Sequence, residues 1–496
     1  MPTYHVENFG CRATQADGAA LERQFEVRGL ARASAAEADL VILNTCTVTS
    51  SADQDARASI RRVQRQNPQA KIIVTGCYAQ RAPQEIAALP GVAAVVGNSH
   101  KHELVEIVTP LLSGSGWRSV SRSATDYVDA DPPLAAEENA SLRSNPLLSQ
   151  SSLIEKWQLR TETSVYVSDI FAHTELLAAP VFESGNAPGA HLADRTRPNL
   201  KVQDGCDNRC SFCVIPSVRG QSRSLPLDRI IAEVNSLVAA GFRELVLSGI
   251  NLGRWGRDLN GIAAHHRLPS LIRAILAETQ LEKLRISSVE PMDWSDDLIH
   301  LVASSPRIAK HAHVPLQAGS DAVLRRMHRK YRPWHYREKI EKIHAAMPAA
   351  AIGADVMTGF PGETDAEFEA TRRLIEDLPF TYLHVFTYSA RPGTPAAAMP
   401  NQIPVHLARE RNGILRDLVS KKKSAFMRTL VGKPIEAITL NLVRNNLVCN
   451  NSSGDFTEAL TDNYQKLHLR GRHEPNRWIT AHIDEIENDI LLAHAA

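Results

Sequence analysis

Three cysteines stand close together in the segment CDNRCSFC, at Cys206, Cys210 and Cys213. Grouped thiols in a reducing compartment are typical metal ligands. A structural zinc site takes four cysteine or histidine ligands, and no fourth stands nearby in the sequence. An iron–sulfur cluster usually takes four thiolates, so three would leave one iron open to bind and cleave a cofactor. We predict such a cluster here, and a zinc site completed by a distant residue is the alternative.

Three further cysteines, Cys11, Cys46 and Cys77, are far apart in the chain but share a local setting. Each follows a short apolar run typical of a β-strand, in the segments HVENFGC, LVILNTC and KIIVTGC. Parallel strands bring their carboxyl ends to one edge of a sheet, where ligands bind. We therefore predict a second three-cysteine cluster at that edge. The alternative is three unrelated small buried cysteines.

Two α/β regions must position these cysteines. In residues 1–111, β-rich runs alternate with amphipathic helical patterns, which predicts a doubly wound parallel sheet. The alternation resumes over residues 197–430 with six strand candidates, fewer than the eight that close a full barrel, so we expect an open, partial (β/α)6 barrel. These strands are expected at 200–203, 244–248, 283–287, 311–315, 351–357 and 381–387.

The remaining residues differ from both α/β regions. Residues 112–196 include ten serines between Ser113 and Ser152 and are interpreted as a serine-rich linker or insertion. Residues 431–496 show short β runs separated by Asn, Gly and Asp, which predicts a small antiparallel β-barrel. The expected fold class is therefore α/β with a small all-β module at the C-terminus.

Bulk composition excludes several classes of protein. The chain has 496 residues, 43% hydrophobic and 22% charged, with a formal net charge of +1, so it gives no global sign of nucleic-acid affinity. The N-terminus lacks the pattern of a signal peptide, and no apolar run reaches the roughly 18 residues that cross a bilayer. We expect a cytoplasmic monomer without a membrane partner.

The spacing of Cys206, Cys210 and Cys213 resembles the radical S-adenosylmethionine (SAM) superfamily. Together with NTCTVTSSADQDAR, GCYAQR, SGINLGRWGRDL and VFTYSARPGTPA, it makes the chain similar to the methylthiotransferase family. The resemblance covers residues 1–111 as a cluster domain, 197–430 as a radical SAM domain and 431–496 as a TRAM-like domain. The closest branch acts on N6-threonylcarbamoyladenosine at position 37 of tRNA.

This resemblance implies two 4Fe–4S clusters and SAM as cofactors. One cluster would generate a 5′-deoxyadenosyl radical that abstracts hydrogen from carbon-2 of the modified adenosine, and the other would supply or carry sulfur. A second SAM would donate the methyl group. The expected partners are tRNA and an electron donor such as flavodoxin or ferredoxin. All six cysteines named above are then catalytic and metal-binding residues.

Other site residues are predicted at or beyond strand ends, where site residues of such barrels collect. The resemblance implies that some of these contact SAM, although each could instead cap a helix or complete a turn. They are Asn251, Ser288, Glu290, Gln317 and Asp355. Substrate contacts are predicted at four arginines that could meet an anion or a phosphate. These are Arg219, Arg223, Arg470 and Arg472.

The acceptor has alternatives. Residues 431–496 hold six Lys/Arg and nine Asp/Glu, which suits a basic protein partner and favours the branch that methylthiolates an aspartate of a ribosomal protein. Thr47, however, follows Cys46 where that branch usually has Gly. Isopentenyladenosine in tRNA is another possible acceptor. A zinc-stabilised RNA-binding protein without catalysis is the alternative of a different class.

Overall fold

The computed structural model describes residues 1–112, 163–172, 196–259, 267–440 and 456–496. Its first unit is a six-stranded parallel sheet in the order β2-β1-β3-β4-β5-β6. The strands are β1 (Thr3–Asn8), β2 (Ala31–Arg32), β3 (Leu40–Thr45), β4 (Lys71–Gly76), β5 (Val92–Val96) and β6 (Ser164–Tyr166). The prediction of a parallel α/β sheet is confirmed.

Alternate residues of these strands face opposite layers of helices, because side chains along a strand point to opposite faces. Val41 and Val74 pack with Ile60 of one layer, whereas Leu40 and Ile73 pack with Leu21 of the other. The first layer is α2 (Ser50–Gln66), α3 (Cys77–Arg81) and α4 (Pro83–Ala87). The second layer is α1 (Arg12–Val27), η1 (Lys101–Glu103), α5 (Leu104–Val108) and η2 (Thr109–Leu112).

The last strand of the first sheet comes from inside the segment predicted to be a linker. β6 pairs in parallel with β5, and η3 (Ile170–Ala172) follows it. The serine-rich stretch from Ser113 to Ser152 lies outside the described residues.

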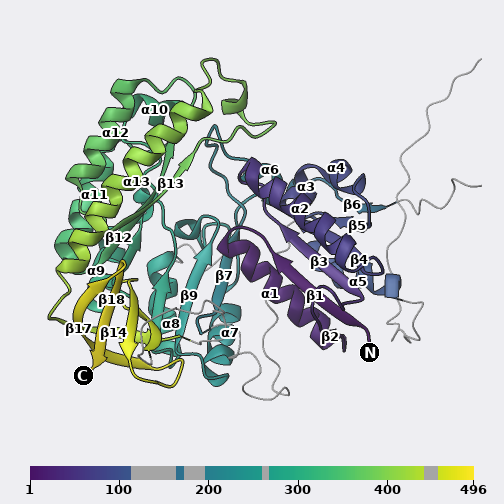
Figure 1. Cartoon of the computed structure of the whole chain (residues 1–496), viewed down its shortest axis with the longest axis horizontal. Coiled ribbons are helices and arrows are strands. Elements are labelled where there is room, and N and C mark those ends of the chain that lie inside the picture. The colour runs from purple at the N-terminus through teal and green to yellow at the C-terminus, as the bar shows by residue number, and fades with distance from the viewer. Residues whose placement is uncertain (113–162, 173–195, 260–266, 441–455) are drawn as a thin grey trace, which may run out of the picture.

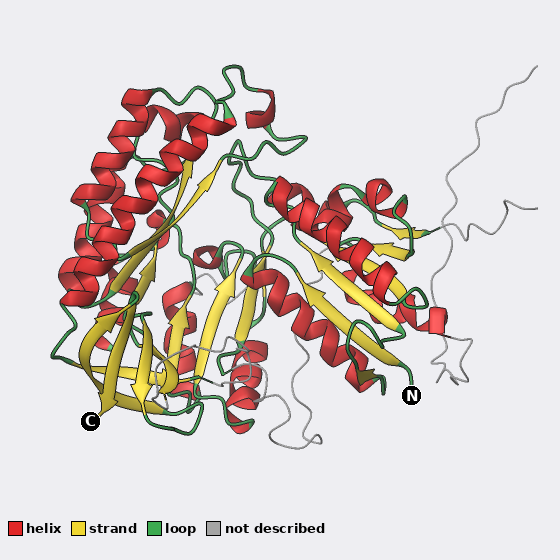
Figure 2. Ribbon diagram, viewed as in Figure 1, coloured by secondary structure: helices red, strands yellow, loops and turns green. Residues whose placement is uncertain are grey.

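The second unit is an open barrel of six parallel strands (Figure 2). A sheet β10-β9-β7-β8 is joined to a sheet β11-β12-β13 by parallel bridges from Leu284 to Ile308 and from Ser288 to His313. The strands are β7 (Asn199–Asp204), β8 (Arg223–Ser224, antiparallel), β9 (Glu244–Gly249), β10 (Lys283–Ile286), β11 (His311–His313), β12 (Ala351–Thr358) and β13 (Tyr382–Thr387). The predicted partial (β/α)6 barrel is therefore confirmed.

Helices cover the outer face of this barrel. A capping box of Thr364 and Glu367, with both hydrogen bonds, starts α12. The helical elements of this unit are α6 (Ile215–Arg219), α7 (Leu227–Ala239), η4 (Leu252–Arg254), α8 (Leu268–Glu278), η6 (Pro291–Asp293), α9 (Asp296–Ser304), α10 (Asp321–Arg326), α11 (Pro333–Ala346), α12 (Asp365–Asp377), η7 (Pro395–Ala398) and α13 (Val405–Arg428).

The C-terminal unit is a closed five-stranded barrel in the order β14-β15-β16-β18-β17. Four of its pairings are antiparallel and one, β16 with β18, is parallel. The strands are β14 (Pro434–Thr439), β15 (Phe456–Thr461), β16 (Lys466–Arg470), β17 (Trp478–Glu487) and β18 (Ile490–Ala495). This agrees with the predicted TRAM-like module. One of the short β runs expected from the sequence of this region, at residues 447–449, lies outside the described residues.

The three units pack together around the six-stranded parallel barrel (Figure 1). Helix α1 of the first sheet lies against β7. The C-terminal barrel covers the amino ends of the parallel strands, where Arg285 donates to the carbonyl oxygen of Asp462 at 3.0 Å and Asn463 donates to that of Ala349 at 3.1 Å. The carboxyl ends of the parallel strands therefore lie at the opposite end of the six-stranded barrel, away from the C-terminal barrel. Within the described parts of the chain, no helix combines the length and the apolar character needed to cross a bilayer.

Candidate active site

The loop that carries Cys206, Cys210 and Cys213 leaves the carboxyl end of β7, as predicted. It begins at Gly205, whose φ of +71° and close approach to the carbonyl oxygen of Gln221 exclude a side chain. The backbone N–H of Cys213 then donates to the carbonyl oxygen of Cys210 at 3.1 Å, and α6 follows. The loop is thus tightly turned, and it holds three sulfur atoms at the mouth of the barrel.

The surroundings of these thiols suit a bound cation. Burial, and secondarily the neighbouring Cys210, raises the pKa of the Cys213 thiol to about 12, and burial also raises the pKa of Cys206. Thiolates at such positions need a positive partner, and the thiolate is the form that binds metal. The donor set therefore fits a metal centre.

In the described residues, the donor atoms that all lie within 4.8 Å of one another belong to His313, Asp355 and His384. A structural zinc site takes four ligands, whereas three thiolates can each bind a different iron of a 4Fe–4S cluster and leave the fourth iron open. Three thiols on one loop therefore fit the cluster that the sequence predicts.

Cys11, Cys46 and Cys77 follow β1, β3 and β4, which are neighbours in the first sheet. Cys46 and Cys77 are buried, and Cys11 is exposed. Burial, then the charges of Cys77 and Cys11, raises the pKa of the Cys46 thiol to about 12. A Cβ on Gly10 would lie 2.7 Å from the Cys46 sulfur, so only glycine lets these loops approach. Sheet topology thus gathers the three thiols at one edge.

Two of the predicted SAM-binding residues lie beside the cysteine loop. The Asn251 side chain donates to the Cys206 sulfur at 3.6 Å, and its backbone N–H donates to Gln203 Oε1 at 2.6 Å. Glu290 forms an ion pair with Arg329, which donates to the Cys210 sulfur at 3.2 Å. Sequence reasoning missed Arg329, because no local motif marks an arginine that lies more than a hundred positions from its cysteine.

The other three predicted residues lie further around the barrel. Ser288 forms a bridge with His313, and the Gln317 N–H donates to the carbonyl oxygen of Asp355 at 2.8 Å. In the described residues, Gln317 Oε1 and Asn251 Oδ1 are buried without a hydrogen-bond partner. Buried polar atoms of this kind are typical of a site that receives a polar ligand. This fits a polar cofactor such as SAM.

Arg219 does not face solvent as a predicted substrate contact would. It is 1% exposed, and its guanidinium donates to Asp17 at 3.0 Å and to Asp204 at 2.9 Å. Lys101 and Lys201 complete this buried ion network of five charged side chains. Burial alone would raise the pKa of Asp17, but the three cations hold it well below its ordinary value.

The network also joins the two cysteine groups. Arg219 Nε donates to the Cys77 sulfur at 3.2 Å, and Arg219 ends helix α6, which starts two residues after Cys213. Cys77 packs against Val214 and Val218 of the same segment. One short segment of the barrel therefore touches both predicted metal sites.

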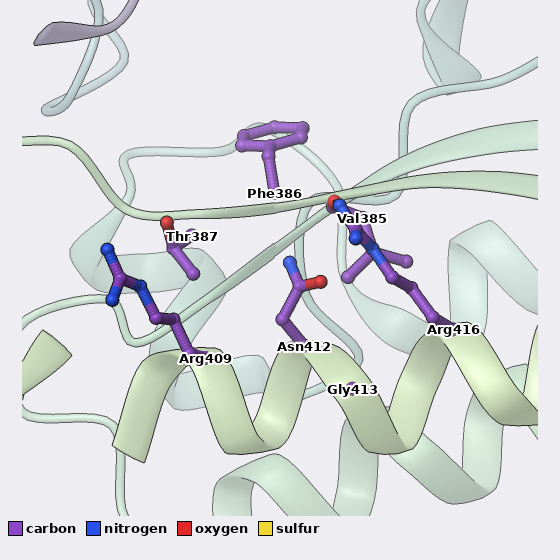
Figure 3. Close-up of a pocket in the computed structure, with 7 residues that line it drawn as sticks. All are labelled: Val385, Phe386, Thr387, Arg409, Asn412, Gly413 and Arg416. Atoms are coloured by element: carbon purple, nitrogen blue, oxygen red, sulfur yellow. The ribbon is translucent and has the colours of Figure 1, made fainter. Parts of the chain in front are cut away.

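The other predicted substrate contacts are separated. Arg223 lies on β8 and donates to the carbonyl oxygen of Arg219 at 2.8 Å. Arg470 and Arg472 lie on the C-terminal barrel, both exposed, and Arg470 is 3.4 Å from Asp484. Figure 3 shows two arginines that sequence reasoning missed, Arg409 and Arg416, in a pocket of about 470 Å³ between β13 and α13.

Comparisons with known proteins agree with this arrangement. Residues 3–97 match an uncharacterized protein family, UPF0004, and residues 200–375 match the radical SAM superfamily. The chain is 33% identical to a threonylcarbamoyladenosine tRNA methylthiotransferase of Bacillus subtilis, over 96% of this chain and 92% of the relative. It is also 33% identical to the threonylcarbamoyladenosine tRNA methylthiotransferase of Aquifex aeolicus, over 95% of this chain and 98% of the relative.

Other relatives are named for a different acceptor nucleoside in tRNA. A tRNA-2-methylthio-N(6)-dimethylallyladenosine synthase of Novosphingobium aromaticivorans is 34% identical over 88% of this chain and 86% of its own. Among solved structures, the radical SAM methyltransferase TsrM of Kitasatospora setae, with cobalamin and a 4Fe–4S cluster bound, has a TM-score of 0.52 at 16% identity. The match covers 80% of this chain and 77% of the TsrM chain. At this identity it shows a likeness of fold alone.

Proposed function

The chain belongs to the radical SAM methylthiotransferase family, and we propose that it adds a methylthio group to carbon-2 of N6-threonylcarbamoyladenosine at position 37 of tRNA. Membership makes the protein a transferase of a family that uses SAM and 4Fe–4S clusters. The threonylcarbamoyl acceptor is favoured because several relatives named for that activity are 30–33% identical over at least 87% of this chain. The relatives that act on dimethylallyladenosine define the second candidate acceptor.

One observation carries this proposal: two three-cysteine groups lie at the carboxyl ends of two separate parallel sheets, and Arg219 joins them. A single open-iron cluster would serve any radical SAM reaction. A second group beside it is what sulfur insertion requires. When bound, SAM and the barrel cluster supply radical chemistry and a methyl group, and the other cluster supplies sulfur.

The chain's own residues hold and orient these groups. Cys206, Cys210 and Cys213 would bind one cluster, and Arg329 would direct a charge-assisted hydrogen bond to the Cys210 sulfur. The neutral side-chain amide of Asn251 would likewise donate a hydrogen bond to the Cys206 sulfur. Outer contacts of this kind fix the geometry of metal ligands and tune the metal.

Cys11, Cys46 and Cys77 would bind the second cluster. Arg219 places a guanidinium beside Cys77, and Asn98 donates to the same sulfur at 3.5 Å. The buried pair of Asp17 and Asp204 keeps that guanidinium in place. Because Arg219 is thus occupied, Arg223, Arg470 and Arg472 remain the proposed contacts to tRNA phosphates.

We further propose tRNA and an electron donor such as flavodoxin or ferredoxin as the partners. The enzyme would act as a monomer in the cytoplasm, where its tRNA substrate is made and used.

Two measurements test the function. After anaerobic reconstitution, wild-type protein should hold about eight irons per chain, and Cys11→Ala should lower this number. About four irons in both proteins would reject the two-cluster arrangement. In a strain that lacks the gene, mass spectrometry of tRNA nucleosides should show loss of the 2-methylthio form of N6-threonylcarbamoyladenosine. An unchanged amount would reject the acceptor.

A further inference from the structure

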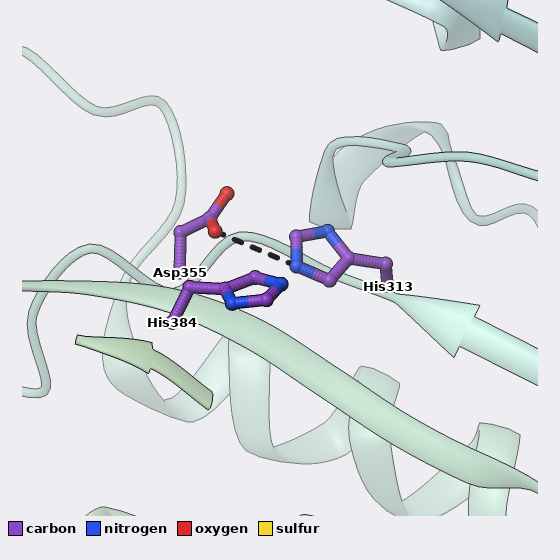
Figure 4. Close-up of side chains that lie close together, drawn as sticks. All are labelled: His313, Asp355 and His384. Atoms are coloured by element: carbon purple, nitrogen blue, oxygen red, sulfur yellow. Dashed lines mark ion pairs between the residues drawn. The ribbon is translucent and has the colours of Figure 1, made fainter. Parts of the chain in front are cut away.

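A cluster of histidines lies inside the barrel, between the cysteine loop and the C-terminal barrel. His313, Asp355 and His384 come from the adjacent strands β11, β12 and β13, and their donor atoms all lie within 4.8 Å (Figure 4). His313 Nε2 is 3.5 Å from Asp355 and has no hydrogen bond in good geometry. We call this group, together with Arg12, the lumen cluster.

Arg12 reaches the same space from the first sheet. Its Nη2 donates to the Tyr464 hydroxyl at 3.2 Å. The Tyr464 ring lies 5.9 Å from the ring of Tyr382, which in turn lies 5.4 Å from the ring of His384. The side chain that follows Cys11 in sequence thus belongs to the wall of the barrel interior. The N-terminal sheet, the barrel and the C-terminal barrel all contribute to this wall.

Arg12 is partly buried, and no carboxylate of the described residues lies within ion-pair distance of it. A guanidinium without a carboxylate partner keeps donors available for an anionic ligand. Burial, His313 and Arg12 all lower the pKa of His384, although Asp355 acts against them. The neutral imidazole can then donate one hydrogen bond to a ligand. Arg12 and the N–H groups of His313 and His384 therefore offer donors to a small anion, and Asp355 offers an acceptor to a polar group of the same ligand.

We propose that Arg12, His313 and His384 bind the carboxylate of the threonylcarbamoyl side chain of the substrate. This inference rests on the proposed function. The threonylcarbamoyl group carries a carboxylate and the dimethylallyl group carries none, so this contact distinguishes the two acceptors. Asp355, 3.5 Å from His313 Nε2, can accept a hydrogen bond from the hydroxyl or N–H groups of the same side chain.

The position of Arg12 connects recognition with chemistry. In adenine, carbon-2 and carbon-6 flank the same ring nitrogen, so the substituent on N6 and the reacting carbon lie on one side of the base. Arg12 directly follows Cys11. The residue that would bind the carboxylate thus directly neighbours, in the chain, a predicted ligand of the sulfur-bearing cluster.

The test uses two anticodon stem-loops, one with the natural acid at position 37 and one with the same side chain as its neutral amide. Wild-type holoenzyme should convert the acid with a kcat/KM about tenfold to a hundredfold higher than the amide. Arg12→Gln should lose this preference by lowering kcat/KM for the acid alone, and His384→Gln should lose part of it. Arg12→Lys, which keeps the charge, should restore part of the preference.

Controls separate the possible outcomes. Arg28→Gln, at the other end of α1, should behave as wild type, and all variants should hold the wild-type amount of iron. Equal rates on acid and amide in wild type, or an unchanged preference in Arg12→Gln, would overturn the inference while the proposed function stands. Failure of wild type on both stem-loops would reject the function and the inference together. A divalent metal other than iron that is lost in His384→Gln would also overturn the inference.

Discussion

The two cysteine groups reach similar settings by different routes. Cys206, Cys210 and Cys213 lie within one turn-rich loop, so the chain brings them together locally. Cys11, Cys46 and Cys77 are brought together only when three strands pair in register. A local group depends on one loop, whereas a distributed group depends on the whole sheet. The difference predicts that the two sites respond differently to the same kind of change.

The largest effect should come from removing one ligand in each group. Cys210→Ala and Cys46→Ala should each lose about half of the iron and all methylthio product, because a cluster with two remaining thiolates is poorly held. Cleavage of SAM should stop in Cys210→Ala and persist in Cys46→Ala. Iron analysis and chromatography of 5′-deoxyadenosine measure this. Equal loss of cleavage in both variants would contradict the assignment of separate roles.

The next effect concerns the buried ion network that joins the groups. Arg219→Leu leaves Asp17 and Asp204 buried with reduced compensation, so the free energy of unfolding should fall by about 3–5 kcal/mol. Urea unfolding measures it. Arg209→Leu, in the exposed part of the cysteine loop, is the matched control and should stay within about 0.5 kcal/mol of wild type. Similar losses in both variants would show that the network adds no stability.

A smaller effect is expected from the contacts to the sulfur atoms. Arg329→Gln removes a charged donor from Cys210 and should weaken iron retention by about tenfold to a hundredfold. Asn98→Ala removes a neutral hydrogen-bond donor from Cys77 and should weaken iron retention less. Iron loss to a chelator, followed over time, compares the two. The reverse order would mean that charge on the donor does not decide retention.

The smallest effect concerns the seam between α1 and α7. Burial raises the pKa of Glu233 to about 7, although Arg23 lies 3.6 Å away. The folded state therefore keeps a proton that the unfolded state releases, so this contribution to stability is present below pH 4.5 and is lost as pH rises through 7. The loss should be at most about 3 kcal/mol, since each pKa unit is worth about 1.4 kcal/mol. Glu233→Gln should flatten this dependence in unfolding experiments, whereas exposed Glu282→Gln should not.

The sequence predicted both cysteine groups for physical reasons that remain valid. A strand followed directly by a cysteine is visible in a single segment, and parallel pairing then dictates where the segments meet. The six strands of the barrel were predictable because their apolar runs are bounded by turns. β6 was not predictable, since a strand of three residues gives almost no periodicity.

Contacts between units could not be read from the sequence. Arg219 was predicted to meet an anionic substrate because it follows the cysteine loop, but its carboxylate partner Asp17 comes from a helix that starts at residue 12. Arg12 and Tyr464, separated by 452 positions, meet only through the packing of three units. No local pattern encodes such pairs.

The buried ion network has a consequence for any attempt to divide the chain. A cut near residue 196 would leave Asp17 and Lys101 on one polypeptide, and Lys201, Asp204 and Arg219 on the other. The second half would then keep two cations against one carboxylate, and the pairs of Asp17 with Lys201 and Arg219 would be lost. Separately produced halves should therefore be poorly soluble or unfolded, and a chimaera that exchanges one half between relatives must carry the matching charges with it.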